Sequence, residues 1–75
     1  MNDLEFYIQL GGHIKQLRKK RGFSLLEFAH RCEIEKASLT RIESGRTNPT
    51  TKTLRIIANQ LEVHVRDLFE FELRK

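Results

Sequence analysis

The spacing of apolar residues within residues 25–45 limits most strongly what this chain can fold into. The apolar and small residues of this segment are Phe28, Ala29, Cys32, Ile34, Leu39 and Ile42. The first three share one face of a helix, because residues three and four apart line up along it, and the last two share a face of a second helix. Ile34 lies between the two helices, where a buried side chain would fix a tight turn. Residues 25–44 are therefore predicted to form a helix-turn-helix.

The second helix of this motif would turn a polar and basic face outward. Its outward residues are Lys36, Ala37, Ser38, Thr40 and Arg41. Small Ala29 lets the two helices cross closely, which leaves this face free. A short polar and basic face of this kind fits the major groove of DNA.

The net charge of +4 is distributed unevenly along the chain. Residues 13–55, which contain the motif, carry eleven Lys or Arg and four Glu, and both flanking segments are slightly acidic. All of the excess positive charge therefore lies around the predicted helix-turn-helix. Although a solvated basic face is common in proteins, its coincidence with the motif favours a polyanionic partner.

The length and composition of the chain restrict the classes of protein it can belong to. Its 75 residues are expected to form one domain, residues 1–75, with no apolar run long enough to span a membrane. The N-terminus is acidic where a signal peptide would be basic, and the single Cys32 cannot form an internal disulfide. A cytoplasmic location is expected.

An enzymatic function is not expected. His13, His30 and His64 are isolated from one another, and no spacing typical of a metal site or a phosphate-binding loop occurs. A chain this short also has little room for a sizeable substrate pocket. The sequence therefore predicts no catalytic residue, no metal and no cofactor.

Helical periodicity and capping residues predict a compact, all-α domain of five helices. These helices are expected at about residues 3–20, 25–32, 36–44, 51–61 and 65–73. Ser24 and Thr50 are suited to cap the second and fourth helices, and Gly45 to end the third. Gly11 and Gly12 weaken the first helix, since each glycine costs about 1 kcal/mol in a helix interior, and its first turns are expected to be irregular.

Four blocks of the sequence, in this order and spacing, resemble a known family of DNA-binding domains. They read IKQLRKKRGFS, LLEFAHRCEIEKASLTRIESG, RTNPTTKTLRIIANQLEV and VRDLF, and they cover about residues 12–69. The chain is similar to the Xre-type, phage-repressor-like (lambda repressor-like) helix-turn-helix family. The resemblance implies a five-helix bundle that binds operator DNA as a homodimer, with the third helix in the major groove. A transcriptional regulator is the expected function.

The resemblance also assigns roles to particular residues. Lys36, Ala37, Ser38 and Arg41 would face base edges, and Thr40 would lie near the backbone or an adjacent base. Lysine and arginine can donate to guanine, and the alanine methyl can pack on thymine. The loop after the third helix would hold phosphates through Arg46, Thr47 and Asn48.

Four further positions are expected to contribute to phosphate binding or to orient the third helix. The amide ends of the second and fourth helices, near Leu25 and Thr51, suit phosphate through their dipoles. Arg18 and Glu43 match a pair that many family members join as a partly buried salt bridge, and Arg18 is also expected to reach a phosphate. Two independent surface charges of little energetic value are the alternative for this pair.

Three residues depart from the family pattern. Leu25 replaces a polar residue, often Gln, and with Leu26 it is interpreted either as extra core or as an exposed contact surface. Glu33 occupies a turn position where the family prefers Gly, so a non-glycine residue must adopt a less favourable conformation. Glu35 replaces the usual Ser or Thr cap. Its carboxylate suits a helix N-terminus, but it either repels phosphate or accepts from cytosine N4.

A second hypothesis, from a different class, is a protein-interaction module of the same fold. Such a module would be an antitoxin that binds a toxin, or an adaptor that binds a polymerase or another regulator. Phe69, Phe71 and Leu73 add apolar surface beyond what one small core needs. The simplest use of this surface is self-association, which predicts a two-fold homodimer through the helix at residues 65–73.

Overall fold

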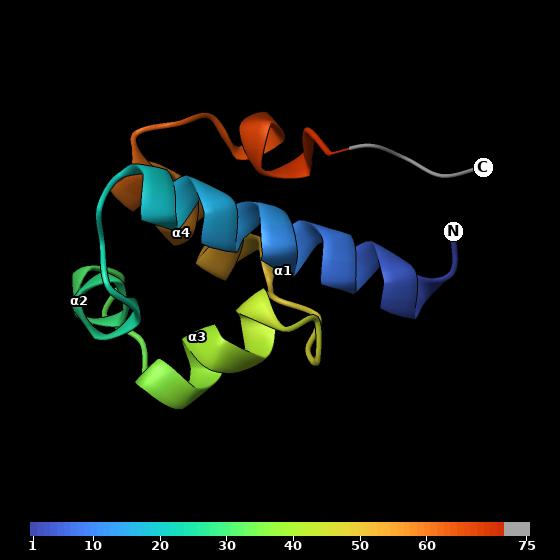
Figure 1. The fold of residues 1–75 in the computed structure, drawn as a ribbon, viewed down its shortest axis with the longest axis horizontal. Helices are drawn as coiled ribbons and strands as arrows, with labels where there is room; N and C mark the ends of the chain where they lie inside the picture. The colour runs from blue at the N-terminus through green and yellow to red at the C-terminus, as the bar shows by residue number, and fades with distance from the viewer. Residues whose placement is uncertain (72–75) are drawn as a thin grey trace.

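The computed structural model describes residues 1–71, which form four α-helices and one short 3-10 helix, with no strand among them (Figure 1). The elements are α1 (Asp3–Lys20), α2 (Leu25–Arg31), α3 (Lys36–Glu43), α4 (Thr51–Leu61) and η1 (Val65–Phe69). The all-α prediction is therefore confirmed for the described part of the chain. The predicted bounds of the first four helices agree with the structure to within one residue.

Side-chain caps explain where three of the α-helices begin. The side-chain oxygens of Asn2, Ser24 and Thr50 accept hydrogen bonds from the backbone N–H three residues further on, at 2.8, 3.1 and 3.1 Å. Such bonds satisfy N–H groups that have no partner within the helix. The capping roles predicted for Ser24 and Thr50 are confirmed.

The helix predicted at residues 65–73 is shorter than expected and is not an α-helix. It is the 3-10 helix η1, which ends at Phe69. The rings of Phe69 and Phe71 both pack on Phe6, with ring centres 6.1 and 5.6 Å from it. Residues two apart point to different sides of an α-helix, so this shared contact requires the chain to leave the helical conformation after Phe69. Leu73 lies outside the described residues.

The glycine pair does not interrupt α1, which runs without a break past Gly11 and Gly12. Gly11 is buried where α1 crosses α3, and a Cβ atom there would overlap the carbonyl oxygen of Ile42 and lie 2.8 Å from that of Glu43. Close packing between α1 and α3 therefore requires glycine at position 11. The expectation of an irregular start to α1 is wrong.

A single core contains buried residues from all five elements. α3 and η1 lie on different sides of α1 (Figure 1). The fully buried side chains include Ile14, Phe28, Leu39, Ile57, Leu61 and Leu68. In residues 1–71, no helix is both long and apolar enough to cross a membrane.

Candidate nucleic-acid interface

The helix-turn-helix forms as the apolar spacing predicts. Ala29 of α2 is fully buried in the core, and Leu39 and Ile42 of α3 are 0% and 5% exposed. These side chains fix one face of α3 against the domain. The opposite face of α3 is therefore directed to solvent.

The turn between α2 and α3 holds a non-glycine residue in the left-handed region. Glu33 has φ 55°, and its backbone N–H donates to the carbonyl of His30 at 3.0 Å. The N–H of the half-buried Ile34 donates to the carbonyl of Ala29, also at 3.0 Å. These bonds end α2 and reverse the chain, so the expected turn is confirmed with Glu33 in the strained position.

The predicted base-reading residues occupy the outer face of α3. Lys36, Ala37 and Arg41 are exposed, and Ser38 and Thr40 are partly exposed. Arg41 Nη2 donates to Ser38 Oγ at 3.3 Å, so this arginine extends along the helix surface. Thr40 Oγ1 donates to the carbonyl of Lys36 at 3.0 Å, which occupies its hydroxyl proton. The three exposed residues are thus the most available for an external ligand.

The loop after α3 positions the predicted phosphate-binding residues. Arg46 Nε donates to Ser44 Oγ at 3.1 Å, and the Arg46 N–H donates to the carbonyl of Arg41 at 2.9 Å. Gly45 has φ 78° and is packed against Ile8 of α1, so the loop is held close to the body of the domain. Arg46 and Asn48 are exposed, and Thr47 is partly exposed.

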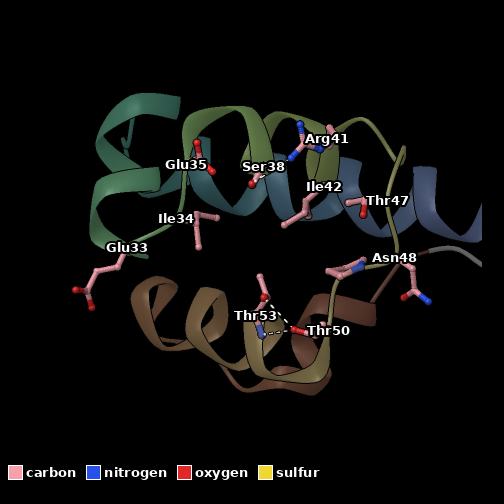
Figure 2. Close-up of a pocket in the computed structure, with 11 residues that line it drawn as sticks. Glu33, Ile34, Glu35, Ser38, Arg41, Ile42, Thr47, Asn48, Thr50 and Thr53 are labelled. Carbon is pink, nitrogen blue, oxygen red and sulfur yellow. Dashed lines mark hydrogen bonds between the residues drawn. The ribbon is translucent and has the colours of Figure 1, made fainter.

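A hollow of about 420 Å³ brings α3, this loop and the start of α4 together. Figure 2 shows Ser38 and Arg41 on one side of it and Thr50 and Thr53 on the other. Thr47 and Asn48 line the loop end of the same hollow. Residues predicted to read bases and residues predicted to hold phosphates therefore share one continuous surface.

Two acidic residues, Glu33 and Glu35, also line this hollow. Both are exposed, and Glu35 precedes α3 without a side-chain capping hydrogen bond. Its carboxylate is therefore free to accept from an external donor. The surface combines hydrogen-bond donors with carboxylates and is not uniformly basic.

The salt bridge between Arg18 and Glu43 forms in the interior, as predicted. Arg18 Nε and Nη2 donate to the two Glu43 carboxylate oxygens at 2.8 and 3.0 Å, and the two side chains are only 7% and 6% exposed. Arg18 Nη1 donates to the carbonyl of Phe23 at 2.8 Å. This geometry ties α3 to α1 and to the start of α2. The phosphate contact predicted for Arg18 stays a prediction.

The two leucines at the start of α2 have different environments. Leu25 is half-buried and packs against the core, whereas Leu26 is 52% exposed. Each interpretation therefore holds for one of the two leucines: Leu25 belongs to the core, and Leu26 lies on the surface. Thr51, at the start of α4, is exposed.

Two of the predicted dimerisation residues, Phe69 and Phe71, already have partners within the chain. Phe69 stacks on Phe6 and is still 37% exposed, and Phe71 is half-buried between Phe6 and His13. His13 Nε2 also forms a 2.8 Å hydrogen bond with the carbonyl oxygen of Asp67. The C-terminal aromatic residues thus help to hold η1 on α1.

Sequence reasoning missed several residues of the surface. It did not include Thr53, whose hydroxyl accepts from Thr50 at 3.0 Å, nor the contact between Ser38 and Arg41. The residues of each pair are three apart on a helix or its cap, and this spacing could have predicted both contacts. The Arg31 guanidinium lies 4.5 Å from the centre of the Phe23 ring, a contact between residues eight apart that no local spacing indicates.

These features define a small helical domain with a helix-turn-helix and a polar, basic outer helix. The chain belongs to the HTH_3 helix-turn-helix family, whose pattern it matches over residues 14–68. The proteins of this family that it resembles are transcriptional regulators and not enzymes.

Two regulators illustrate the similarity in sequence. The chain is 37% identical over 62 residues to the transcriptional regulator SinR of Bacillus subtilis, which covers 81% of this chain and 56% of SinR. It is 35% identical over 63 residues to DdrOP3 of Deinococcus deserti, covering 84% of this chain and 49% of that protein. The chain thus spans about half the length of these relatives.

Solved structures show the same fold. An HTH_3 family transcriptional regulator from Vibrio cholerae superposes with a TM-score of 0.83 and 40% identity, over 91% of this chain and 38% of that one. SinR in complex with DNA superposes with a TM-score of 0.76 and 37% identity, over 81% of this chain and 98% of that one.

Proposed function

We propose that this protein is a transcriptional regulator that binds a specific duplex DNA sequence as a homodimer. The observation that carries the proposal is the outer face of α3, where Lys36, Ala37 and Arg41 are exposed on a helix fixed by a buried salt bridge. Family membership and the similarity to SinR, whose structure was solved with DNA, support this assignment.

In this proposal the base edges are read from α3. Lys36 and Arg41 donate to acceptors of guanine, and the Ala37 methyl contacts a thymine methyl. Ser38 both contacts the DNA and orients Arg41 through their 3.3 Å hydrogen bond. Thr40 lies near the DNA backbone or an adjacent base. Its hydroxyl proton is already donated to the carbonyl of Lys36, which leaves the oxygen to accept from a base amino group.

Phosphate contacts come from the edges of the same surface. Arg46, Thr47 and Asn48 hold one strand, which fixes the position of the domain without reading sequence. Backbone N–H groups near Leu25 and Thr51, at the starts of α2 and α4, donate to further phosphates. Arg18 acts mainly by positioning α3, since its donors are bound to Glu43 and Phe23.

The homodimer provides the second half of the recognition. A two-fold pair of domains would present two α3 helices to half-sites one helical turn apart, about 34 Å, which predicts a pseudo-palindromic operator. Phe69, Phe71 and Leu73 are the C-terminal residues we assign to the dimer contact. Occupancy of a promoter would then block or recruit polymerase. Because the relatives are bacterial and bacterial DNA lies in the cytoplasm, we place the protein there.

Selection of binding sites from random duplexes, with the purified protein alone, tests this function. A palindromic motif is expected. Binding that depends on salt but not on sequence would instead support the protein-interaction module, in which a toxin, polymerase or other regulator is the partner.

A further inference from the structure

Gly12 is a helix glycine without an explanation inside the molecule. It lies in the middle of α1, and a Cβ atom built on it would meet nothing within 4 Å. Glycine in a helix interior costs about 1 kcal/mol relative to alanine. The neighbouring Gly11 offsets this cost by close packing against α3, whereas Gly12 faces open space.

Gly12, which is partly exposed, is the midpoint of a stripe along α1 whose other residues are exposed, although Ile8 also packs against Gly45. The residues of this stripe, spaced alternately three and four apart, are Glu5, Ile8, Gly12, Lys15 and Lys19. This spacing places all five on one face and is the spacing of a helix that packs along a second helix. Ile8 is 47% exposed, and Leu4 at the edge of the stripe is 61% exposed.

The stripe lies on a part of the chain that the family pattern only partly covers. The family match begins at residue 14, so Glu5, Ile8 and Gly12 precede it. Ile8 and Gly12 also border a hollow of about 500 Å³ between α1 and residues 70–71. The surface of α1 is therefore open at Gly12.

The charges of the stripe are opposite at its two ends. Glu5 lies near the N-terminus of α1, and Lys15 and Lys19 lie toward its C-terminus. None of the three has an ion-pair partner among residues 1–71. Two copies of α1 that cross antiparallel at Gly12 would place Glu5 of each copy opposite Lys19 of the other. The same register sets Ile8 beside the aliphatic stem of the other Lys15.

We propose that the stripe on α1 is a dimer contact in which two copies of this chain pack antiparallel and cross at Gly12. The proposal rests on the homodimer of the proposed function and adds an interface on α1 to the C-terminal aromatic residues. Glycine at the crossing point allows the two helix backbones to approach closely. The exposed Ile8 side chains then become buried between the two helices.

Charge reversal tests the contact, with the oligomeric state measured by sedimentation velocity without DNA. Glu5→Lys and Lys19→Glu are each expected to weaken the dimer by about tenfold or more, because like charges then face each other. The double variant is expected to recover most of the lost affinity. Asp3→Lys and Lys20→Glu are matched controls, since they change the same charges next to the stripe but outside it.

A steric variant provides a second test. Gly12→Leu is expected to yield a folded monomer with an unchanged circular dichroism spectrum, because a Cβ atom at this position meets nothing of its own chain within 4 Å. A dimer unchanged by Gly12→Leu and by both charge reversals overturns the α1 contact and leaves the proposed homodimer with another interface. A wild-type chain that is monomeric at tens of micromolar overturns both the contact and the homodimer, while site selection tests DNA reading separately.

Discussion

At the scale of single residues, the pair of Arg18 and Glu43 decides how α3 is presented. The pair joins three parts of the domain, because Arg18 of α1 binds both Glu43 of α3 and the carbonyl of Phe23 before α2. Two buried charges stabilise the domain only while both are present, since either one alone would be buried without compensation.

Replacement of Glu43 by Ala is therefore expected to lower the free energy of unfolding by about 3–5 kcal/mol. Urea unfolding followed by circular dichroism measures this change. Glu27→Ala is the matched control, because Glu27 forms an exposed pair with Arg31 at 3.9 Å that is worth less than about 1 kcal/mol. Equal losses in the two variants would contradict the role given to Glu43.

The buried thiol of Cys32 gives a prediction for pH dependence. Burial raises the pKa of the Cys32 thiol from 9.0 to about 11, so the folded domain retains this proton where the unfolded chain loses it. The contribution of this thiol to the free energy of unfolding is complete below about pH 9. As the pH rises from there toward about 11, the free energy of unfolding falls by about 1.4 kcal/mol per pH unit. Urea unfolding measures the free energy of unfolding of the wild type and of Cys32→Ala between about pH 9 and pH 11. This free energy should fall more steeply with pH in the wild type, and equal slopes in the two proteins would refute the prediction.

At the scale of elements, the sequence predicted the ends of the helices that local contacts determine. The side chains of Ser24 and Thr50 cap α2 and α4 through bonds to residues only three positions away, so both starts were predictable. The end of η1 was not, because it depends on Phe69 and Phe71 packing on Phe6, more than sixty residues earlier. The buried role of Gly11 likewise depends on α3 and has no local signal.

The two adjacent glycines of α1 provide a matched test of its packing. Gly11→Ala is expected to destabilise the domain, because the new methyl group overlaps the backbone of α3. Gly12→Ala is expected to stabilise it by up to about 1 kcal/mol, since helix propensity improves without a clash. Thermal unfolding, with the chain dilute enough to be monomeric, measures both, and effects of the same sign would contradict this packing.

At the scale of the whole molecule, most of the candidate site was predictable because it lies on one helix and the following loop. Helical periodicity alone separates Lys36, Ala37 and Arg41 from the buried Leu39 and Ile42. The joining of this helix to the start of α4 in one hollow was not predictable, since it depends on how α3 and α4 pack in three dimensions. The fold thus converts two separate segments into one surface that suits a DNA groove and its phosphates.

The binding of two arginine variants to the selected duplex, and to single-base changes of it, tests most directly whether α3 reads DNA. Arg41→Ala is expected to cost about 1–3 kcal/mol and to lose discrimination at one position of each half-site. Arg46→Ala is expected to weaken all duplexes about equally and to lower the salt dependence by about one unit for each phosphate that the arginine no longer neutralises. If Arg41→Ala binds the selected duplex as tightly and as selectively as the wild type, α3 does not lie in the groove as proposed.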